Sequence, residues 1–468
     1  MAETNEHNVK SAPRGFLPVM GALGPGIVLA GGVVGSGELI NTPIQAAKFG
    51  FVLLWAVIIA CLIKYFLQVE IARHCVVHNR SVFEAMNFVP GPRARDTSWV
   101  VWLFMLAWAV VQIGSAGTVG AIAGVIHGLV PMSTWFPAAD AELANVRSVR
   151  IWAVLVAGAG LLLMWRGLYH QLEKLIIVLV LGFSVTVLVG LVMLQGTEFS
   201  IKSSDISEGM AFSLGDEENR RAAAFAVIAL MGGLGVSGIE LLVYPYWIRE
   251  KGYAEFLGDP NSPGWSDRAR GWIRIIKIDA AAATILATVI TAAFFLLGCA
   301  ILHRQGIEPE GIGVVDKMSA IFTGTYGNWS RGLFLTGAFC TLFSTLLHAT
   351  AANARIFTDF FASIRWIDRQ NPRSMNLSHR IVQALFLLVV MTTFIYLPSQ
   401  PEQLVLLSQY LIGLVGTPIA IIVILFLAFQ TDRRVRMNRL TALLFVISVA
   451  VILFCVGAGF GFQQGWIQ

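Results

Sequence analysis

Charged residues are scarce in this chain of 468 residues. Only 13% of the positions are Asp, Glu, Lys or Arg, whereas 56% are hydrophobic. Soluble globular domains carry charges on about a quarter of their residues, and the apolar runs that recur here are typical of helices that cross a bilayer. The composition therefore predicts an all-α polytopic membrane protein, with no segment long and polar enough to form a soluble domain.

Cysteine is also rare, and several chemical signatures are missing. The five cysteines lie in or near apolar runs without short ligand spacing, so neither a disulfide framework nor a zinc site is predicted. The sequence contains no P-loop for ATP and no cluster of His, Asp and Glu at catalytic spacing. The net charge of +5 is spread over alternate loops instead of forming one basic patch. We therefore expect neither an enzyme nor a nucleic-acid-binding protein, and no cofactor.

Apolar segments long enough to span the membrane divide the chain into eleven predicted helices. Most Lys and Arg residues fall in the loops before the odd-numbered helices, which places the N-terminus, with its tail over residues 1–15, in the cytoplasm. An odd number of spans places the C-terminus outside, and we expect the plasma (inner) membrane as the location. The predicted spans are 16–45, 50–72, 99–130, 149–166, 171–196, 222–247, 273–302, 330–358, 380–398, 403–429 and 440–461.

The first span contains an acidic residue between glycines and apolar residues, in the stretch Gly35-Ser36-Gly37-Glu38. A charge at bilayer depth costs several kcal/mol. Each glycine lowers helix propensity by about 1 kcal/mol relative to alanine, so we expect the helix to unwind here and to expose backbone carbonyls that can bind ions. The sixth span repeats the pattern at Ser237-Gly238-Ile239-Glu240.

The two interrupted spans open two matching halves of the chain. Helices 1–5 (residues 16–196) and helices 6–10 (residues 222–429) contain five spans each, and an odd number forces the halves into opposite orientations. The last helix, 440–461, lies outside this repeat. The sequence therefore predicts a five-plus-five inverted repeat with broken helices 1 and 6.

Glu38 and Glu240 would approach the membrane midplane from opposite sides in such a repeat. Two carboxylates in a medium of low dielectric constant repel each other unless a cation or a shared proton lies between them. The pair therefore predicts a cation site. Two other interpretations remain open: each acid caps a helix end, or each is protonated and bonded to a nearby carbonyl.

Several motifs extend this pattern. They are Gly24-Pro25-Gly26, the stretch Gly35 to Glu38, the run Gln45 to Phe51 with Leu53-Leu54-Trp55, and, more weakly, Ser408-Gln409 with Thr417-Pro418 and Ala351-Ala352-Asn353. Together these motifs resemble helices 1, 2, 8 and 10 of the Nramp (SLC11) family of divalent-metal transporters. The resemblance covers about the first ten helices, and it implies a LeuT-type fold of the APC superfamily.

The ligand positions differ from those of the family. Gly35-Ser36-Gly37-Glu38 stands where family members carry Asp-Pro-Gly-Asn, and Ser237-Gly238-Ile239-Glu240 stands where they carry Met-Pro-His-Asn. The second change removes a thioether, and the remaining oxygen ligands favour harder cations such as Mg²⁺ or Mn²⁺. Gly114 and Gly117 replace the acids that the family uses for proton passage. We therefore do not expect proton coupling by the family's route.

These observations predict a secondary transporter that moves a cation, of the Mg or Mn class, through the bilayer by alternating access as a monomer. We expect Glu38, Glu240 and Gln409 to bind the metal ion. The full set of expected substrate-binding residues is Glu38, Glu240, Gln409, Gly35, Ser36, Ser237 and Asn353.

Two other functions remain open at this point. The first is a LeuT-type carrier of a small organic amine, and the second is a membrane sensor or scaffold that transports nothing. Among the other polar residues in spans, Lys64 is a candidate counter-charge for one of the acids. Arg355 and Asp359 are four residues apart, a spacing at which opposite charges pair on a helix.

Overall fold

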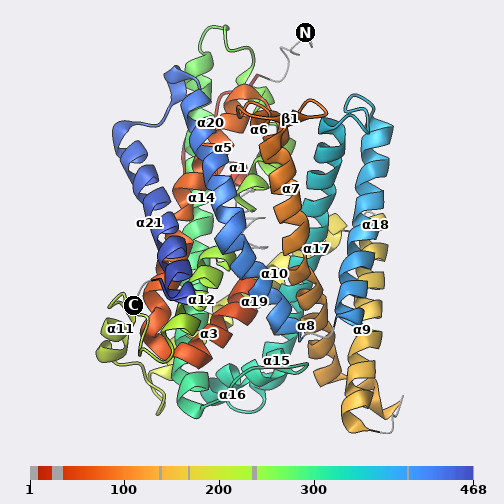
Figure 1. The fold of residues 1–468 in the computed structure, drawn as a ribbon, viewed down its shortest axis with the longest axis vertical. Coiled ribbons are helices and arrows are strands. Elements are labelled where there is room, and N and C mark those ends of the chain that lie inside the picture. Colours follow the sequence, from red (N-terminus) through yellow and green to blue (C-terminus); the bar gives the residue numbers. More distant parts are fainter. Residues whose placement is uncertain are drawn as a thin grey trace.

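The structure is a computed structural model that describes residues 9–23, 35–135, 140–166, 169–234, 240–397 and 400–466. Long helices form one bundle, and a small hairpin lies at one end of it (Figure 1). The hairpin pairs β1 (Arg93–Ala94) with β2 (Thr97–Ser98) in antiparallel register. The architecture is therefore almost entirely helical, as the composition predicted.

The helices of the two halves of the chain are as follows. The first half forms α1 (Phe16–Ala22), α3 (Thr42–Phe49), α4 (Leu54–Leu62), α5 (Lys64–His78), α6 (Val82–Met86), α7 (Trp99–Val111), α8 (Ile113–Leu129), α9 (Ala141–Trp165), α10 (Tyr169–Leu194) and α11 (Ser203–Gly209). The second half forms α12 (Arg220–Gly233), α13 (Tyr244–Glu250), α14 (Trp265–Leu297), α15 (Val314–Met318), α16 (Ala320–Tyr326), α17 (Ser330–Ser363), α18 (Pro372–Tyr396), α19 (Pro401–Leu411), α20 (Thr417–Gln430) and α21 (Arg439–Gln464).

Short π-helical and 3-10 segments connect or interrupt these helices. The π-helical segments are η2 (Gly37–Asn41), η7 (Gly298–His303) and η8 (Ile412–Gly416). The 3-10 segments are η3 (Gly50–Leu53), η4 (Met132–Thr134), η5 (Glu240–Leu242), η6 (Glu255–Leu257) and η9 (Arg433–Val435). Because π-helical turns inside longer helices occur frequently at functional sites, η2 and η8 are of particular interest.

Eight helical stretches among the described residues are long and apolar enough to cross a membrane. Three of the eleven predicted spans are not among them. The predicted spans 16–45 and 222–247 are interrupted by residues outside the described ranges, and the predicted span 171–196 corresponds to α10, whose described apolar part is only Val178–Leu194. The number eleven therefore stays a prediction.

Glycines on α8 let neighbouring helices approach closely. A methyl group at Gly114 would collide with the Ser408 side chain, and one at Gly117 would collide with the Pro401 carbonyl oxygen. Small residues at such contacts let helix backbones pack closely inside a membrane. Gly114 and Gly117 thus allow α8 to pack closely against α19.

Several arginines lie at one end of the bundle. α6, the β1–β2 hairpin and the loop between α17 and α18 lie at one end, and α11, α15 and α16 lie at the other (Figure 1). The segments at the first end carry Arg93, Arg95, Arg365 and Arg369, and we call it the arginine-rich end.

Candidate functional site

Glu38 lies where the first helix begins after the break. It is the second residue of the π-helical segment η2, and its side chain is 1% exposed. The backbone N–H of Gly35 donates a hydrogen bond to Glu38 Oε2 at 3.0 Å. The carboxylate therefore folds back over the start of its own helix, where backbone N–H groups and the helix dipole stabilise negative charge. A carboxylate oxygen can accept more than one bond, so this contact is compatible with a bound cation.

The first break touches the end of α12, backbone against backbone. A methyl group at Gly37 would collide with the carbonyl oxygen of Gly233, the last residue of α12. A methyl group at Gly233 would in turn collide with the side chain of Gln409. At Gly37 a side chain is thus excluded by backbone, and at Gly233 the missing side chain leaves room for Gln409. The two glycines bring η2, α12 and α19 together around one point.

Gln409 is held by a residue that sequence reasoning missed. Asn41 Nδ2 donates to Gln409 Oε1 at 2.5 Å and to the Ala229 carbonyl oxygen at 3.4 Å, and Gln45 Nε2 donates to Asn41 Oδ1 at 3.0 Å. All three amide side chains are at most 6% exposed. The available signal was the spacing: Asn41 and Gln45 are polar, four residues apart, and follow Glu38 directly in an apolar segment.

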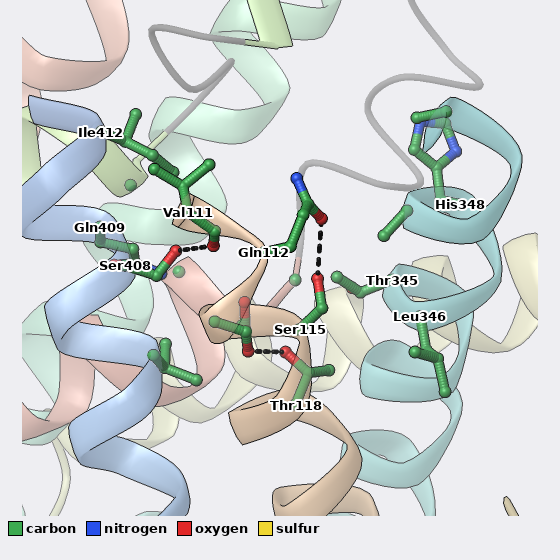
Figure 2. A pocket seen from close by; sticks show the side chains of 18 of the residues that line it. Val111, Gln112, Ser115, Thr118, Thr345, Leu346, His348, Ser408, Gln409 and Ile412 are labelled. Atoms are coloured by element: carbon green, nitrogen blue, oxygen red, sulfur yellow. Dashed lines mark hydrogen bonds between the residues drawn. The ribbon is translucent and has the colours of Figure 1, made fainter. Parts of the chain in front are cut away.

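A cavity of about 120 Å³ opens beside this point. Gly35, Ser36, Glu38 and Gln409 line one side of it. Figure 2 shows the side formed by α8, where Gln112, Ser115 and Thr118 follow one another toward the lower part of the view. With Asn353, which also lines the cavity, five of the seven predicted site residues are therefore brought together in one space.

Hydroxyl groups near the cavity are largely tied to backbone or amide oxygens. Ser408 Oγ donates to the Val111 carbonyl at 2.6 Å, Thr118 Oγ1 donates to the Gly114 carbonyl at 3.1 Å, and Ser115 Oγ donates to Gln112 Oε1 at 3.4 Å (Figure 2). Each hydroxyl oxygen keeps lone pairs that can accept further bonds. The α8 wall can therefore accept hydrogen bonds from water or from a hydrated ion.

Asn353 also lines the cavity, and its amide bonds to three neighbours. Trp108 Nε1 donates to Asn353 Oδ1 at 2.8 Å, and Asn353 Nδ2 donates to Gln112 Oε1 at 3.0 Å and to the Ala349 carbonyl at 2.8 Å. These bonds hold α7, α8 and α17 together. Asn353 thus shapes the cavity. Both of its amide hydrogens are committed to these contacts.

Two stacked rings also line the cavity. The rings of Trp247 on α13 and His348 on α17 stack with centroids 4.7 Å apart, and both residues line the cavity. The Arg355 guanidinium lies over the Trp247 ring at 5.3 Å. The second half of the broken helix is thereby fixed against α17.

The second break is described only at its two edges. α12 ends at Gly233, and helical structure resumes at Glu240 in η5. Ser237 lies outside the described residues, and of Glu240 only the backbone is described. Lys64, predicted as a counter-charge, is 1% exposed, and its Nζ donates to the carbonyl oxygen of Leu234 at 2.7 Å. A buried ammonium group therefore lies at the edge of this break.

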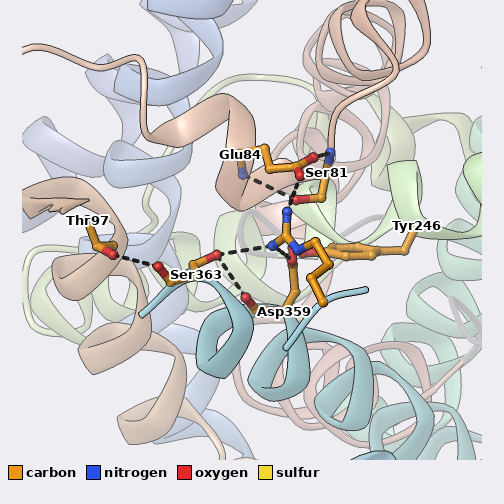
Figure 3. Close-up of polar contacts among 7 residues, drawn as sticks. Ser81, Glu84, Thr97, Tyr246, Asp359 and Ser363 are labelled. Atoms are coloured by element: carbon orange, nitrogen blue, oxygen red, sulfur yellow. Dashed lines mark hydrogen bonds and ion pairs between the residues drawn. The ribbon is translucent and has the colours of Figure 1, made fainter. Parts of the chain in front are cut away.

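A second polar cluster lies at the arginine-rich end, and it corrects the prediction that Arg355 pairs with Asp359. Arg369 instead forms ion pairs with Asp359 and Glu84, and Tyr246 Oη donates to Asp359 Oδ2 at 2.6 Å (Figure 3). Arg355 pairs with Glu250 through two bonds of 2.6 and 2.9 Å. Longer-range partners on α6, α13 and the loop after α17 thus outcompete the local pair.

Glu84 in this cluster has a lowered pKa. Burial by itself would raise the pKa, but the hydrogen bond from the Ser81 backbone N–H, at 2.6 Å, and the nearby Arg369 guanidinium outweigh burial. Ser81 also accepts from the Glu84 N–H at 3.2 Å, so the two residues form a capping box at the start of α6. Glu84 is therefore ionised at neutral pH and ties α6 to Arg369.

Three comparisons with known proteins identify the family and the fold. The model of the family described as "Natural resistance-associated macrophage protein-like" matches residues 26–462. The divalent metal cation transporter MntH of Brucella suis biovar 1 (strain 1330) is 23% identical over 444 residues, which are 93% of this chain and 86% of the relative.

Solved structures agree on the architecture. The Eremococcus coleocola manganese transporter superposes with a TM-score of 0.60 at 15% identity, over 98% of this chain and 92% of that one. MhsT in complex with L-phenylalanine gives 0.58 at 13% identity, over 94% and 98% of the two chains. Mhp1, a nucleobase-cation-symport-1 family transporter, gives 0.54 at 15% identity, over 97% and 92%. The predicted LeuT-type fold is confirmed. Because the family model spans nearly the whole chain, the protein belongs to the Nramp family, whose members are membrane transporters and not enzymes.

Proposed function

We propose that this protein carries a divalent metal cation across the membrane by alternating access, and that the ion binds in the cavity beside Glu38 and Gln409. The observation that supports this proposal is a buried carboxylate at a helix break, next to an internal cavity and to the end of a second broken helix. Intramembrane carboxylates that face a cavity mark ion pathways. The curated relative is a divalent metal cation transporter, and a structural relative is a manganese transporter.

The chemistry of the cavity favours a hard cation of the Mg or Mn class. Carboxylate, amide, hydroxyl and backbone oxygens come from Glu38, Gln409, Ser36 and Gly35, whereas no Met or Cys occurs among the described residues that line the cavity. Oxygen donors suit Mg²⁺ and Mn²⁺, and thioether or thiolate donors suit softer ions. Glu240 and Ser237 complete the proposed set from the second break, and Asn353 shapes the passage.

We also infer the orientation in the membrane. Arginine-rich loops remain on the cytoplasmic side of membrane proteins, so the arginine-rich end faces the cytoplasm, the N-terminus lies inside and the C-terminus lies outside. We further propose that the protein lies in the plasma (inner) membrane as a monomer.

Flux into proteoliposomes tests the proposal. The protein is reconstituted, Mn²⁺ or Mg²⁺ is added outside, and uptake is followed with a metal-sensitive dye trapped inside. We expect Glu38→Gln to reduce the flux at least about tenfold, because it removes a charged ligand of the ion. Glu402→Gln is the matched control, since Glu402 is a carboxylate with 4% exposure that accepts from the Gly311 N–H at 3.0 Å, away from the cavity.

Three results would contradict the proposal. Uptake of an organic amine that is independent of divalent metal would favour the amine carrier instead. Saturable binding of metal without flux would indicate a sensor or scaffold. Equal flux in Glu38→Gln and in the wild type would show that the ion binds elsewhere.

A further inference from the structure

Four polar side chains lie on one side of α5. Successive residues of a helix are rotated by 100°, so Lys64, Gln68, His74 and His78 fall within a sector of about 120°. The first three are at most 1% exposed, and His78 is half-buried near the arginine-rich end. We call these four residues the α5 stripe. None of them is among the residues that line the cavity, so the stripe is separate from the proposed ion passage.

The stripe begins beside the proposed cation site. Lys64 Nζ donates to the carbonyl oxygen of Leu234, one residue beyond Gly233, and Gly233 lines the cavity. The Cys61 thiol, three residues before Lys64, lies within electrostatic range of both Lys64 and Glu38. The inner end of the stripe and the carboxylate of the site therefore share one neighbourhood.

The middle of the stripe presents polar atoms that lack a partner within the described part of the chain. Gln68 has neither its amide nitrogen nor its amide oxygen bonded, and the Nε2 atoms of His74 and His78 are likewise unpaired. Buried polar groups in proteins are normally hydrogen-bonded, and internal water is the usual partner when the protein supplies none. Successive stripe residues are thus suited to be linked through water.

The proton on His74 can be placed from its neighbours. Thr431 Oγ1 donates its only proton to the Leu427 carbonyl at 3.1 Å, so at its 3.1 Å contact with His74 Nδ1 the hydroxyl oxygen accepts. Nδ1 therefore carries hydrogen in neutral His74, and Nε2 presents a lone pair. That atom can accept a proton from a water molecule and return it to a water molecule that also reaches His78, whose ring centroid is 4.6 Å from that of His74.

The charged groups around the stripe disfavour a lasting positive charge on the imidazoles of His74 and His78. Arg80 lies near both histidines, and Asp432 near His78 is already bonded to Arg434. On the side of α14, Glu70 pairs with Arg73 at 3.3 Å within range of Lys277, and Tyr65 Oη donates to the Lys277 carbonyl at 3.4 Å. The Thr431 hydroxyl and the Leu427 carbonyl also lie beside His74, and the Gln430 carbonyl lies beside His78. Because most of the charged neighbours are positive, a protonated imidazole is destabilised here, and it tends to give its proton to a nearby water molecule.

We propose that the α5 stripe conducts protons between the cation site and the arginine-rich end. Chains of ionisable residues inside membrane helices are the usual form of proton relays. This inference rests on the proposed function. The proposed proton path runs along α5, because Gly114 and Gly117 on α8 carry no ionisable side chain that could pass a proton. Each step moves a proton between two water molecules, or between a water molecule and the Nε2 atom of His74 or His78. The Gln68 amide holds the connecting water by hydrogen bonds and keeps its own protons.

Proton flux into proteoliposomes tests the route with and without metal. A pH-sensitive dye is trapped inside, and inward flux is driven first by Mn²⁺ and then, without metal, by a potassium diffusion potential. We expect Gln68→Leu, His74→Phe and His78→Phe to lower proton flux at least about tenfold, because each removes a relay group. His127→Phe is the control, since His127 lies on α8 and contacts Ser148 at 2.8 Å, outside the stripe.

Binding of Mn²⁺ separates loss of the relay from loss of the fold. We expect all four variants to bind Mn²⁺ within about twofold of the wild type, because none of the altered residues lines the cavity. Wild-type proton flux in the folded stripe variants would overturn the inference, as would a wild type that conducts no protons in either assay. Absence of Mn²⁺ flux in the wild type would instead refute the proposed function, while the metal-free assay still decides on the relay.

Discussion

Replacing Asn41 with leucine isolates the contact that positions Gln409. Asn41 makes three side-chain hydrogen bonds, two as donor to Gln409 Oε1 and the Ala229 carbonyl and one as acceptor from Gln45 Nε2. Asn41→Leu keeps the volume similar and removes all three. Each buried polar group that loses its only partner costs about 1–3 kcal/mol. Removal of a residue that orients a metal ligand lowers metal affinity by about 10–100-fold.

Asn353→Leu is the matched comparison. Asn353 also makes three side-chain hydrogen bonds, with Trp108, Gln112 and Ala349, and is equally buried. We expect the two variants to lose similar thermal stability in detergent. In isothermal titration with Mn²⁺, only Asn41→Leu should lose affinity by the factor given above. Equal loss of Mn²⁺ affinity in both variants would refute the reasoning, because general destabilisation would then explain the loss.

Two further predictions concern the helix contact and the arginine-rich end. Gly37→Ala forces a methyl group against the Gly233 carbonyl oxygen and should lower the free energy of unfolding by about 1–3 kcal/mol. In the control Gly182→Ala the methyl group meets open space, so the free energy of unfolding should stay the same or rise by up to about 1 kcal/mol. Denaturation in mixed micelles measures both variants. Because the pKa of Glu84 is lowered in the folded state, its pairing with Arg369 stabilises the protein above the ordinary value of 4.5 and is lost as the pH falls below it. The difference in melting temperature between the wild type and Glu84→Gln should therefore be present at pH 7 and should vanish in acid, and a difference that grows in acid would contradict the assignment.

The sequence was sufficient for the fold because the signals were local. Long apolar segments depend on the composition of a few neighbouring residues, and the long apolar helices of the structure agree with them. At the glycines before Glu38 the structure has the π-helical segment η2, and the predicted unwinding of Gly35 to Glu38 is not seen at Gly37 and Glu38. Glu38 and Gln409 were predicted as partners in one site, and both line the same cavity.

The remaining features depend on contacts between distant segments. Asn41 and Gln409 are 368 positions apart in the chain, so no periodicity could reveal that one holds the other. Arg355 and Asp359 had a favourable spacing, but Glu250 and Arg369 lie closer in space and offer better geometry. The predictions for Ser237 and Glu240 stay predictions, because their side chains lie outside the described residues.

The contact between Gly37 and Gly233 has a mechanical consequence. Side chains between two helices can absorb small displacements by changing rotamer, but here the carbonyl of one helix end rests directly on the backbone of the other. No side chain lies at this contact that could change rotamer and absorb a displacement. A shift of the end of α12 by a fraction of an ångström must therefore displace η2, and with it the carboxylate of Glu38, so this contact couples the positions of the two broken helices directly.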